Sequence, residues 1–491
     1  MKSISEILCV PRPKHICAKG EGTYRTASYD PSQVQVELNP VVKHPEGYRI
    51  RVQDGQITVT ANTRAGRFYA MQTLRQVMNG APEIPDFCLC DEPEFEYRGF
   101  MIDCSRHFFT VDELKKMIDA AALYKLNKFH WHLTDDQGWR IEIESYPLLT
   151  QFASKRKGSH FGWEKDSGEE YGGFYTKAEI REVVQYCADR CIEVIPEIDM
   201  PGHMCAAIAA YPYLSCTQKP IPVRNFGGIF RDILCAGKES TYDFVCQVLD
   251  EVIELFPSRW IHLGGDEAPK DRWRKCPHCR EVMEREHIAD AEGLQGYFTN
   301  RVVDYLAFKG VRATVWNDSL KSGNLKNSVA VQMWMDHGGY CVRRANRGGK
   351  VIVSDVSGYY LDYPYGVTPL DKTYNLNPLL PGLTFEGERN IIGVEGTLWA
   401  EYIPDFERLC YQAYPRLAAV AEAGWTAPSA KELYGFERRF VASMPLLHEA
   451  GVTPAPQGKW RPSEIAGKLQ AARFYLGRMN RDVIKNQLDL K

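Results

Sequence analysis

Two adjacent carboxylates, Asp266 and Glu267, follow a short apolar segment that ends in two glycines, at residues 259–265. The segment is typical of a buried strand, and the glycines allow the backbone to turn into a loop and a ligand to approach closely. Neighbouring side chains on a regular strand point to opposite faces, so both acids can serve one pocket only from such a loop. A helix N-terminus decorated with acids is the alternative, because an Ala-Pro pair follows. This stretch alone leaves both interpretations open.

The composition limits the classes of partner. The 491 residues are 44% hydrophobic and 12% aromatic, which is ordinary for a globular enzyme. A formal net charge of -3 gives no electrostatic basis for binding nucleic acid or an anionic membrane. No segment has the length and apolarity needed to span a bilayer. The sequence therefore predicts neither a nucleic-acid partner nor a membrane partner, and it leaves the oligomeric state open.

The first eight residues lack the apolar region of a secretory signal. The 15 cysteines are odd in number and scattered along the chain, which fits reduced thiols better than a disulfide framework. We expect a cytoplasmic protein, with the alternative that a signal peptide has already been trimmed away.

Residues 1–95 predict a small α+β domain. Apolar and polar residues alternate at residues 33–38, 48–52 and 56–60, as in half-buried strands, and a helical pattern follows at 64–78. Nothing in this domain is typical of catalysis. Residues 86–93 are interpreted as a linker to the next domain.

From residue 97 onward, short apolar segments alternate with helical patterns. The predicted strands lie at residues 100–103, 129–133, 192–197, about 261, 311–316, 329–334, 351–354 and 391–394, with helices at 112–124, 177–189, 244–256 and 406–423. This α/β order favours a closed (β/α)8 TIM barrel at residues 96–450, followed by a C-terminal helical segment at 451–491 packed on the barrel. An open doubly wound sheet is the rival, but the glycine-rich phosphate turn usual after its first strand is absent.

Polar and aromatic residues follow the predicted strands at their carboxyl ends, the face on which TIM barrels carry their active sites. They are Arg98, Asp103 to His107, His132, Asp135, Asp136, Glu197, Asp199, His203, Asp266, Glu267, Trp316, Asp318, Trp334, Asp336, Tyr360, Asp362, Trp399 and Glu401. One such residue alone would mean little, but a full ring predicts an active site.

The sequence resembles glycoside hydrolase family 20, the β-N-acetylhexosaminidases, over nearly its whole length. The motifs that carry the resemblance are YRGF at residues 97–100 with SRH at 105–107, HWHLTDDQGWR at 130–140, EIDMPGH at 197–203 and HLGGDE at 262–267, together with GRFYAMQTL at 66–74. The resemblance implies exo-acting hydrolysis of terminal β-linked N-acetylglucosamine or N-acetylgalactosamine, with retention at the anomeric carbon.

The resemblance also implies a substrate-assisted mechanism. Most retaining glycosidases use a carboxylate nucleophile, whereas here the 2-acetamido oxygen of the sugar attacks the anomeric carbon and forms an oxazolinium ion. Glu267 would act first as general acid and then as base, Asp266 would orient the acetamido N–H, and Tyr360 would donate to the acetamido oxygen. Because Glu267 must hold a proton at working pH, we expect burial and the charge of Asp266 to raise its pKa.

The remaining implied roles concern the sugar and a relay. In the relay, Asp135 would hold His203, and His203 would contact Glu267. The presence of both Asp362 and Glu401 favours a closed pocket for one terminal sugar, and a lacto-N-biosidase-type release of a disaccharide is a minor alternative. The implied sugar contacts are Arg98 at the 3- and 4-hydroxyls, Asp362 and Glu401 at the 4- and 6-hydroxyls, and Trp316, Trp334 and Trp399 around the acetamido methyl group.

Two other classes of function are weighed against this one. A metal-dependent barrel hydrolase could use His130 and His132, which share one strand face, with His203, His262 and Asp266. The usual barrel amidohydrolase instead carries its paired histidines on the first strand, and the acids after His132 suit a sugar site equally well. A non-catalytic carbohydrate-binding protein is the other class, but a binder has no need of the acid pair.

Cys276 and Cys279 form a lone CxxC, which is half of a zinc site. No second pair follows at a suitable spacing, although Cys88 and Cys90 could join them in space. We therefore expect no metal and no other cofactor.

Overall fold

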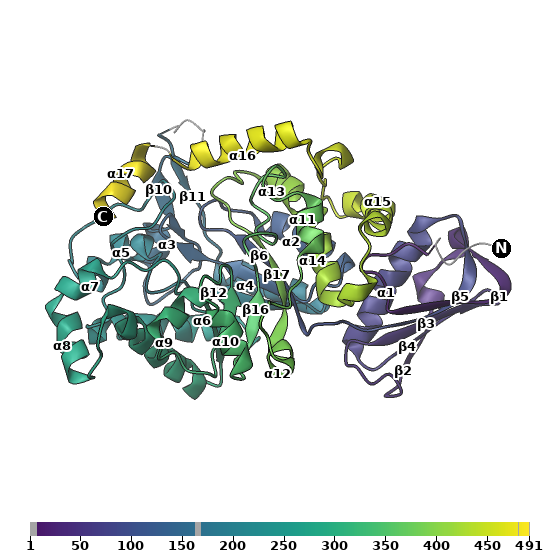
Figure 1. The fold of residues 1–491 in the computed structure, drawn as a ribbon, viewed down its shortest axis with the longest axis horizontal. Coiled ribbons are helices and arrows are strands. Elements are labelled where there is room, and N and C mark those ends of the chain that lie inside the picture. Colours follow the sequence, from purple (N-terminus) through teal and green to yellow (C-terminus); the bar gives the residue numbers. More distant parts are fainter. Residues whose placement is uncertain (1–6, 163–167, 480, 491) are drawn as a thin grey trace.

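The computed structural model describes residues 7–162, 168–479 and 481–490. A small domain built on one sheet lies at one end of a larger closed barrel, and the last helices run along the barrel (Figure 1). The predicted TIM barrel with a preceding α+β domain is confirmed. Residues 1–6, which contribute to the localisation expectation, lie outside the described residues.

The small domain is a five-stranded sheet covered by helix α1, Arg64–Gly80. Along the sheet the strands are β1 (His15–Arg25), β5 (Glu83–Asp91), β3 (Tyr48–Gln53), β4 (Gln56–Ala61) and β2 (Gln35–Leu38). Strand β3 alternates strictly between buried and exposed residues, so one face of the sheet packs against α1.

The predicted linker at residues 86–93 is wrong. Its first part belongs to β5, which pairs antiparallel with both β1 and β3 and is therefore an inner strand. Pro85 and Asp86, residue types that are depleted in strands, concealed the strand pattern.

The larger domain is a closed barrel in which every predicted strand is present. In chain order the strands are β6 (Tyr97–Asp103), β7 (Lys128–His132), β12 (Glu193–Glu197), β13 (Trp260–His262), β14 (Arg312–Trp316), β15 (Ala330–Met333), β16 (Val351–Val353) and β17 (Ile391–Leu398). All residues of β6 and β17, the pair that closes the barrel, are buried. Strands covered on both faces are expected to be apolar throughout rather than alternating.

Helices surround the barrel, and shorter elements fill its loops. The longer helices are α2 (Val111–Leu123), α4 (Lys177–Asp189), α6 (Glu239–Leu255), α9 (Ala291–Phe308), α13 (Phe406–Ala413) and α14 (Arg416–Trp425). The shorter elements are α3 (Leu148–Gln151), α5 (Cys205–Ala210), α7 (Asp271–Lys275), α8 (Pro277–Arg285), α10 (Tyr340–Asn346), α11 (Leu370–Asn375), α12 (Phe385–Glu388), the 3-10 helix η5 (Asn317–Ser322) and the hairpins β8 (Thr134–Asp135) with β9 (Gly138–Trp139) and β10 (Lys155–Lys157) with β11 (Glu170–Gly172).

The predicted helix at residues 406–423 is in fact two helices, α13 and α14, that meet at Tyr414 and Pro415. Proline has no N–H to donate and disfavours the helical conformation of the residue before it, so the helix is interrupted there.

Three helices complete the chain: α15 (Leu433–Glu449), α16 (Glu464–Arg478) and α17 (Arg481–Leu490). Helix α16, drawn in yellow in Figure 1, runs along the barrel, and the ring of its Phe474 lies 5.3 Å from that of Tyr402 in the loop after β17. Among the described residues, no helix is both long and apolar enough to cross a membrane.

Candidate active site

The turn after β13 brings Asp266 and Glu267 into one cavity. Gly264 and Gly265 have φ angles of 62° and 96°, which side chains disfavour, and Glu267 itself has a φ of 46°. A Cβ on Gly264 would lie 1.7 Å from Oδ1 of Asp199, and the N–H of Gly265 donates to that same oxygen at 3.0 Å. Because the chain leaves the strand geometry here, both acids line the cavity at the carboxyl end of the barrel.

His203 lies beside this acid pair. Its Nε2 is 3.7 Å from Oε2 of Glu267 and 3.9 Å from Oδ2 of Asp266. Its Nδ1 is 3.0 Å from Oδ1 of Asp135 and 3.3 Å from Oδ2 of Asp136. The imidazole therefore links two groups of carboxylates, which is the arrangement that a relay behind the acid requires.

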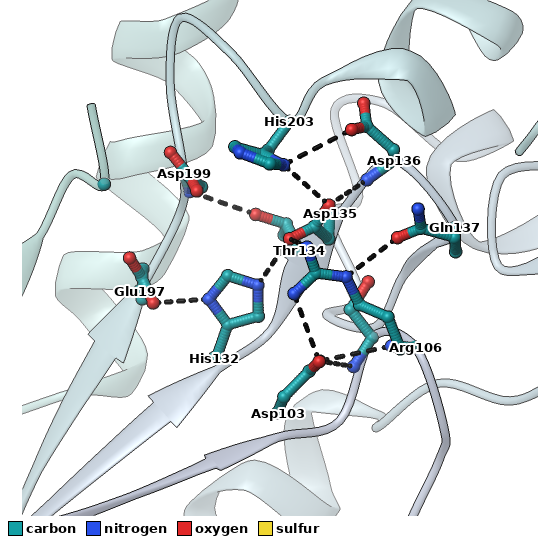
Figure 2. Close-up of polar contacts among 12 residues, drawn as sticks. Asp103, Arg106, His132, Thr134, Asp135, Asp136, Gln137, Glu197, Asp199 and His203 are labelled. Atoms are coloured by element: carbon teal, nitrogen blue, oxygen red, sulfur yellow. Dashed lines mark hydrogen bonds and ion pairs between the residues drawn. The ribbon is translucent and has the colours of Figure 1, made fainter. Parts of the chain in front are cut away.

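Asp135 contacts Arg106, two histidines and the backbone N–H of Asp136 in a buried network, drawn in Figure 2. Nη2 of Arg106 lies 2.7 Å from Oδ2 of Asp135, and Nε2 of His132 lies 2.9 Å from the same oxygen. Arg106 is fixed in turn by Asp103 at 3.1 Å and by Gln137 at 2.9 Å. The guanidinium also lines the cavity, 3.9 Å from Glu401.

The prediction that Arg98 contacts the sugar is wrong. Arg98 is the second residue of β6, at the amino end of the barrel, and its side chain is fully buried. It donates to both oxygens of Glu46 in the small domain, at 2.9 and 2.8 Å, and packs over the Trp425 ring. Arg106, which belongs to the SRH motif but has no role assigned from the sequence, does line the cavity.

Trp334, Tyr360 and Trp399 are among the aromatic residues that line the cavity. The Tyr360 ring lies 6.2 Å from that of Trp334 and 6.3 Å from that of Trp399, so the three form one wall. Trp334 is held by a hydrogen bond from its indole to Asp318, at 2.7 Å.

Trp316, which we expected in the same wall, lies behind it. It is fully buried, it is not among the residues that line the cavity, and its indole N–H donates to Glu197 at 2.8 Å. Its ring is 5.8 Å from that of Trp399, so it packs behind Trp399 and supports it.

The cavity is bounded at another side by Asp362 and Glu401, as the sequence predicts, and by residues that the sequence analysis missed. Tyr402 and Arg478 also line it, and Arg478 comes from α16 at the far end of the chain. Its guanidinium donates to the Tyr363 hydroxyl at 3.1 Å. No strand-end pattern marks Arg478, so only the path of α16 over the barrel reveals it.

Two family descriptions match this chain: "Glycosyl hydrolase family 20, catalytic domain" over residues 95–428 and "Glycosyl hydrolase family 20, domain 2" over residues 17–91. The chain belongs to glycosyl hydrolase family 20. Residues 95–428 are accordingly a family 20 glycoside hydrolase catalytic domain.

Named relatives of this family 20 chain agree with that assignment. A Porphyromonas gingivalis β-hexosaminidase is 41% identical over 454 residues, which cover 87% of this chain but only 57% of that protein. An Akkermansia muciniphila β-hexosaminidase is 38% identical over 413 residues, which cover 81% of this chain and 82% of that protein.

Solved structures are similar as well. A β-N-acetylhexosaminidase crystal structure is 32% identical, with a TM-score of 0.85 over 94% of this chain and 99% of the other. A mutant Streptomyces plicatus β-hexosaminidase in complex with its product GlcNAc is 30% identical, with a TM-score of 0.79 over 94% of this chain and 98% of the other.

Of the four histidines in the metal-hydrolase alternative, His203 lines the cavity, and the other three contact Glu197 below it. Nε2 of His130 lies 3.0 Å from Glu197, Nδ1 of His262 lies 2.9 Å from it, and His132 also contacts it. Glu197 is fully buried, so these rings and Trp316 satisfy a charge in the barrel interior. Their arrangement explains the conspicuous histidines without a hydrolytic metal, and the family assignment favours the glycosidase.

Burial dominates the electrostatics of the acid pair. It raises the pKa of Asp266 to about 7, with the His203 cation opposing the rise and the Glu267 charge adding to it. Burial also raises the pKa of Glu267; His203 again opposes, and the acidic neighbours that add to the rise are Asp318 and Glu401. The Glu267 side chain is 36% exposed against 13% for Asp266, so Glu267 is the more accessible acid.

His203 itself has a pKa well above its usual range. Burial lowers this pKa, but the charges of Asp135 and Asp199, together with the hydrogen bonds to Asp135 and Asp136, outweigh burial and raise it. The imidazole therefore carries a positive charge at neutral pH. That charge faces both carboxyl groups of the acid pair and limits how far their pKa values rise.

Proposed function

We propose that this chain is an exo-acting, retaining β-N-acetylhexosaminidase that removes terminal β-linked GlcNAc or GalNAc from an oligosaccharide or glycoconjugate. The observation that carries the proposal is the joint position of Asp266 and Glu267 in one cavity beside a charged His203. Neighbouring residues on a regular strand would point to opposite faces, so Asp266 and Glu267 can face one ligand because the chain turns into a loop after β13.

In the proposed first step, the acetamido oxygen of the substrate attacks the anomeric carbon while the glycosidic bond breaks. Glu267 gives its proton to the leaving oxygen, which departs as an alcohol. Asp266, in its ionised form, accepts a hydrogen bond from the acetamido N–H and stabilises the positive charge that develops on the amide. Tyr360, whose hydroxyl keeps its proton because burial and Asp266 raise its pKa well above the usual range, donates to the acetamido oxygen.

In the second step, Glu267 acts as a base and takes a proton from water, which opens the oxazolinium ring at the anomeric carbon. Two displacements at one carbon give net retention. Asp135 and His203 act through the acid pair: Asp135 keeps His203 charged and in place, and His203 orients Glu267. Trp334 and Trp399 exclude water from the acetamido group, which strengthens its polar contacts.

Sugar specificity is proposed to rest on Arg106, Asp362 and Glu401. Charged partners of sugar hydroxyls make stronger hydrogen bonds than neutral ones. Asp362, Glu401 and Arg478 together close one side of the cavity, which supports release of a single sugar over release of a disaccharide. A cytoplasmic location remains a proposal, supported by the odd number and scattered positions of the cysteines. The absence of nucleic-acid and membrane partners is likewise a proposal, supported by the net charge of -3.

Hydrolysis of 4-nitrophenyl β-glycosides tests the proposal. Both N-acetylated amino sugars should be cleaved, the parent glucoside and galactoside should not, and NMR of early product should show the β anomer. The variant E267Q should lower kcat for a natural glycan, with its unactivated leaving group, by about 10²–10⁴-fold and leave product binding intact. E254Q, on the exposed face of α6, is the control. Equal cleavage of glucosides, or full activity in E267Q, would refute the assignment.

A further inference from the structure

Four cysteines from three separate stretches of the chain meet beside the active-site loops. They are Cys216, Cys235, Cys276 and Cys279, and their sulfur atoms all lie within 4.8 Å of one another. Three are buried and Cys216 is partly buried. The CxxC at 276–279 thus gains a second pair, but not the one considered from the sequence, because Cys88 and Cys90 lie on β5 of the small domain.

The sulfur spacing is that of a tetrahedral tetrathiolate site. The Sγ atoms of Cys235 and Cys279 are 3.7 Å apart, and both Cys216–Cys279 and Cys235–Cys276 are 3.8 Å apart. Zinc–sulfur bonds of about 2.3 Å in a regular tetrahedron place neighbouring sulfur atoms about 3.8 Å apart. A polynuclear iron–sulfur cluster would hold its cysteines farther apart, since sulfide and several irons lie between them.

Disulfides explain the arrangement less well. A disulfide joins each sulfur to one partner at about 2.05 Å. Here Cys235 lies equally close to Cys276 and Cys279, and Cys279 lies equally close to Cys216 and Cys235. The sulfurs form one cluster and not two pairs. Buried cysteines of the ordinary apolar kind, such as Cys341 and Cys410, are not part of it.

The local backbone is built to bring the ligands together. Ser215 and Leu234 form an antiparallel bridge, and the N–H of Cys235 donates to the carbonyl of Leu214 at 2.8 Å, so Cys216 and Cys235 lie on adjacent segments. Cys276 caps α8 and Cys279 lies in its first turn. The indole of Trp273 donates to the carbonyl of Leu234 at 2.8 Å and ties the two parts together.

We propose that Cys216, Cys235, Cys276 and Cys279 bind one zinc ion in a closed, structural site. All four ligand positions are filled by protein, so the ion has no open position for a substrate and takes no part in glycoside hydrolysis. The two thiolate pairs come from the loop after β12 and from α7–α8 after β13, drawn at the left of Figure 1.

The site fastens two loops that carry catalytic groups. Cys276 follows Glu267 by nine residues in the sequence. On the other side, the N–H of Leu234, next to Cys235, donates to the carbonyl of Pro201 at 2.9 Å, two residues before His203. A metal that joins these segments would fix the distance between His203 and the acid pair, and its loss would loosen both loops.

Metal analysis of the purified full-length wild type tests the proposal directly. The chain, produced in zinc-supplemented medium and purified without a chelator, should contain one equivalent of zinc by plasma mass spectrometry. Exchange with Co²⁺ should give the intense near-ultraviolet and visible bands of a tetrahedral cobalt tetrathiolate. Iron at the same stoichiometry, or wild type without metal, would overturn the assignment.

Substitutions then locate the site. C276S/C279S should lose the zinc and the cobalt spectrum and unfold at a lower temperature, whereas C341S and C410S should keep one equivalent. Zinc retained in C276S/C279S would refute the proposal. A wild-type mass lower by two hydrogens for each cysteine pair would also refute it, because that loss indicates disulfides. If C276S/C279S does not fold, the wild-type metal content and the cobalt spectrum still decide. Wild-type glycosidase activity tests the proposed function separately, because the metal content is measured without substrate.

Discussion

Replacing Arg98 should lower the stability of the protein without lowering its catalytic activity. The variant R98M removes a fully buried guanidinium and leaves Glu46, whose side chain is 16% exposed, with only the weaker donors Asn127 and Tyr69, each at 3.1 Å. Removing one partner of a buried ion pair costs about 3–5 kcal/mol, because the remaining charge is uncompensated. We expect the free energy of unfolding to fall by that amount at pH 7.

The pH dependence of this loss has a defined sign. Burial raises the pKa of Glu46, but the charge and hydrogen bonds of Arg98, together with hydrogen bonds from Asn127 and Tyr69, outweigh it, and the net result is a pKa below the ordinary value of 4.5. A depressed carboxyl pKa contributes stability above the unfolded-state pKa, and that contribution is lost as pH falls through the folded-state pKa. The difference between wild type and R98M should therefore shrink in acid. Adding E46Q to R98M should restore part of the stability at pH 7.

Urea unfolding followed by circular dichroism measures the loss, and initial rates on the 4-nitrophenyl substrate measure catalysis in the folded variant. R98M should keep kcat/KM within about two-fold of wild type, as expected for a residue that touches no reacting group. R106M, at the cavity, should lower kcat/KM by about 10²-fold or more. A folded R98M with a kcat/KM as low as that of R106M would refute the placement of Arg98.

Two further predictions concern the acid pair. D135N removes a charge that raises the pKa of His203, so His203 loses its proton at lower pH than in the wild type. A neutral His203 no longer lowers the pKa of Glu267, so the alkaline limb of the kcat/KM profile should move to higher pH. A shift of that limb to lower pH would contradict the relay. G264A forces a Cβ against Asp199 and should lower kcat by about 10²-fold. G310A is the control, because Gly310 has a similar φ of 71° and no neighbour within 4 Å of the added Cβ. It should cost about 1–2 kcal/mol of stability and leave kcat unchanged. Equal kcat in both glycine variants would show that the turn does not position the acids.

The sequence predicts the barrel well because its signal is local. Each strand is a short apolar segment, and polar residues follow it directly, so both the order of the strands and the ring of candidate residues can be read along the chain. The turn at Gly264 and Gly265 likewise follows from residue types. Asp266, Glu267, Tyr360, Asp362 and Glu401 all reach the cavity by this logic.

The sequence predictions fail for residues whose place in the structure depends on their position along a strand or on contacts between distant segments. Arg98 lies at the start of β6 and Arg106 follows its end, so the two arginines lie at opposite ends of the barrel. Arg478 and the cysteines at 216 and 235 depend on contacts between distant segments. The β5 strand was missed because Pro85 breaks the local pattern while pairing on both sides stabilises it.

Trp425 closes the last barrel helix, α14, yet its indole belongs to the apolar core of the small domain. Lys125, fully buried, lies 4.4 Å from the centre of that ring and 3.2 Å from Asp91 on β5. The two modules keep separate apolar cores, but an indole from the barrel completes the core of the small domain. A barrel excised at residue 95 would expose this indole to water and leave Arg98 and Lys125 without their anions, Glu46 and Asp91, so the barrel should need the small domain for its stability.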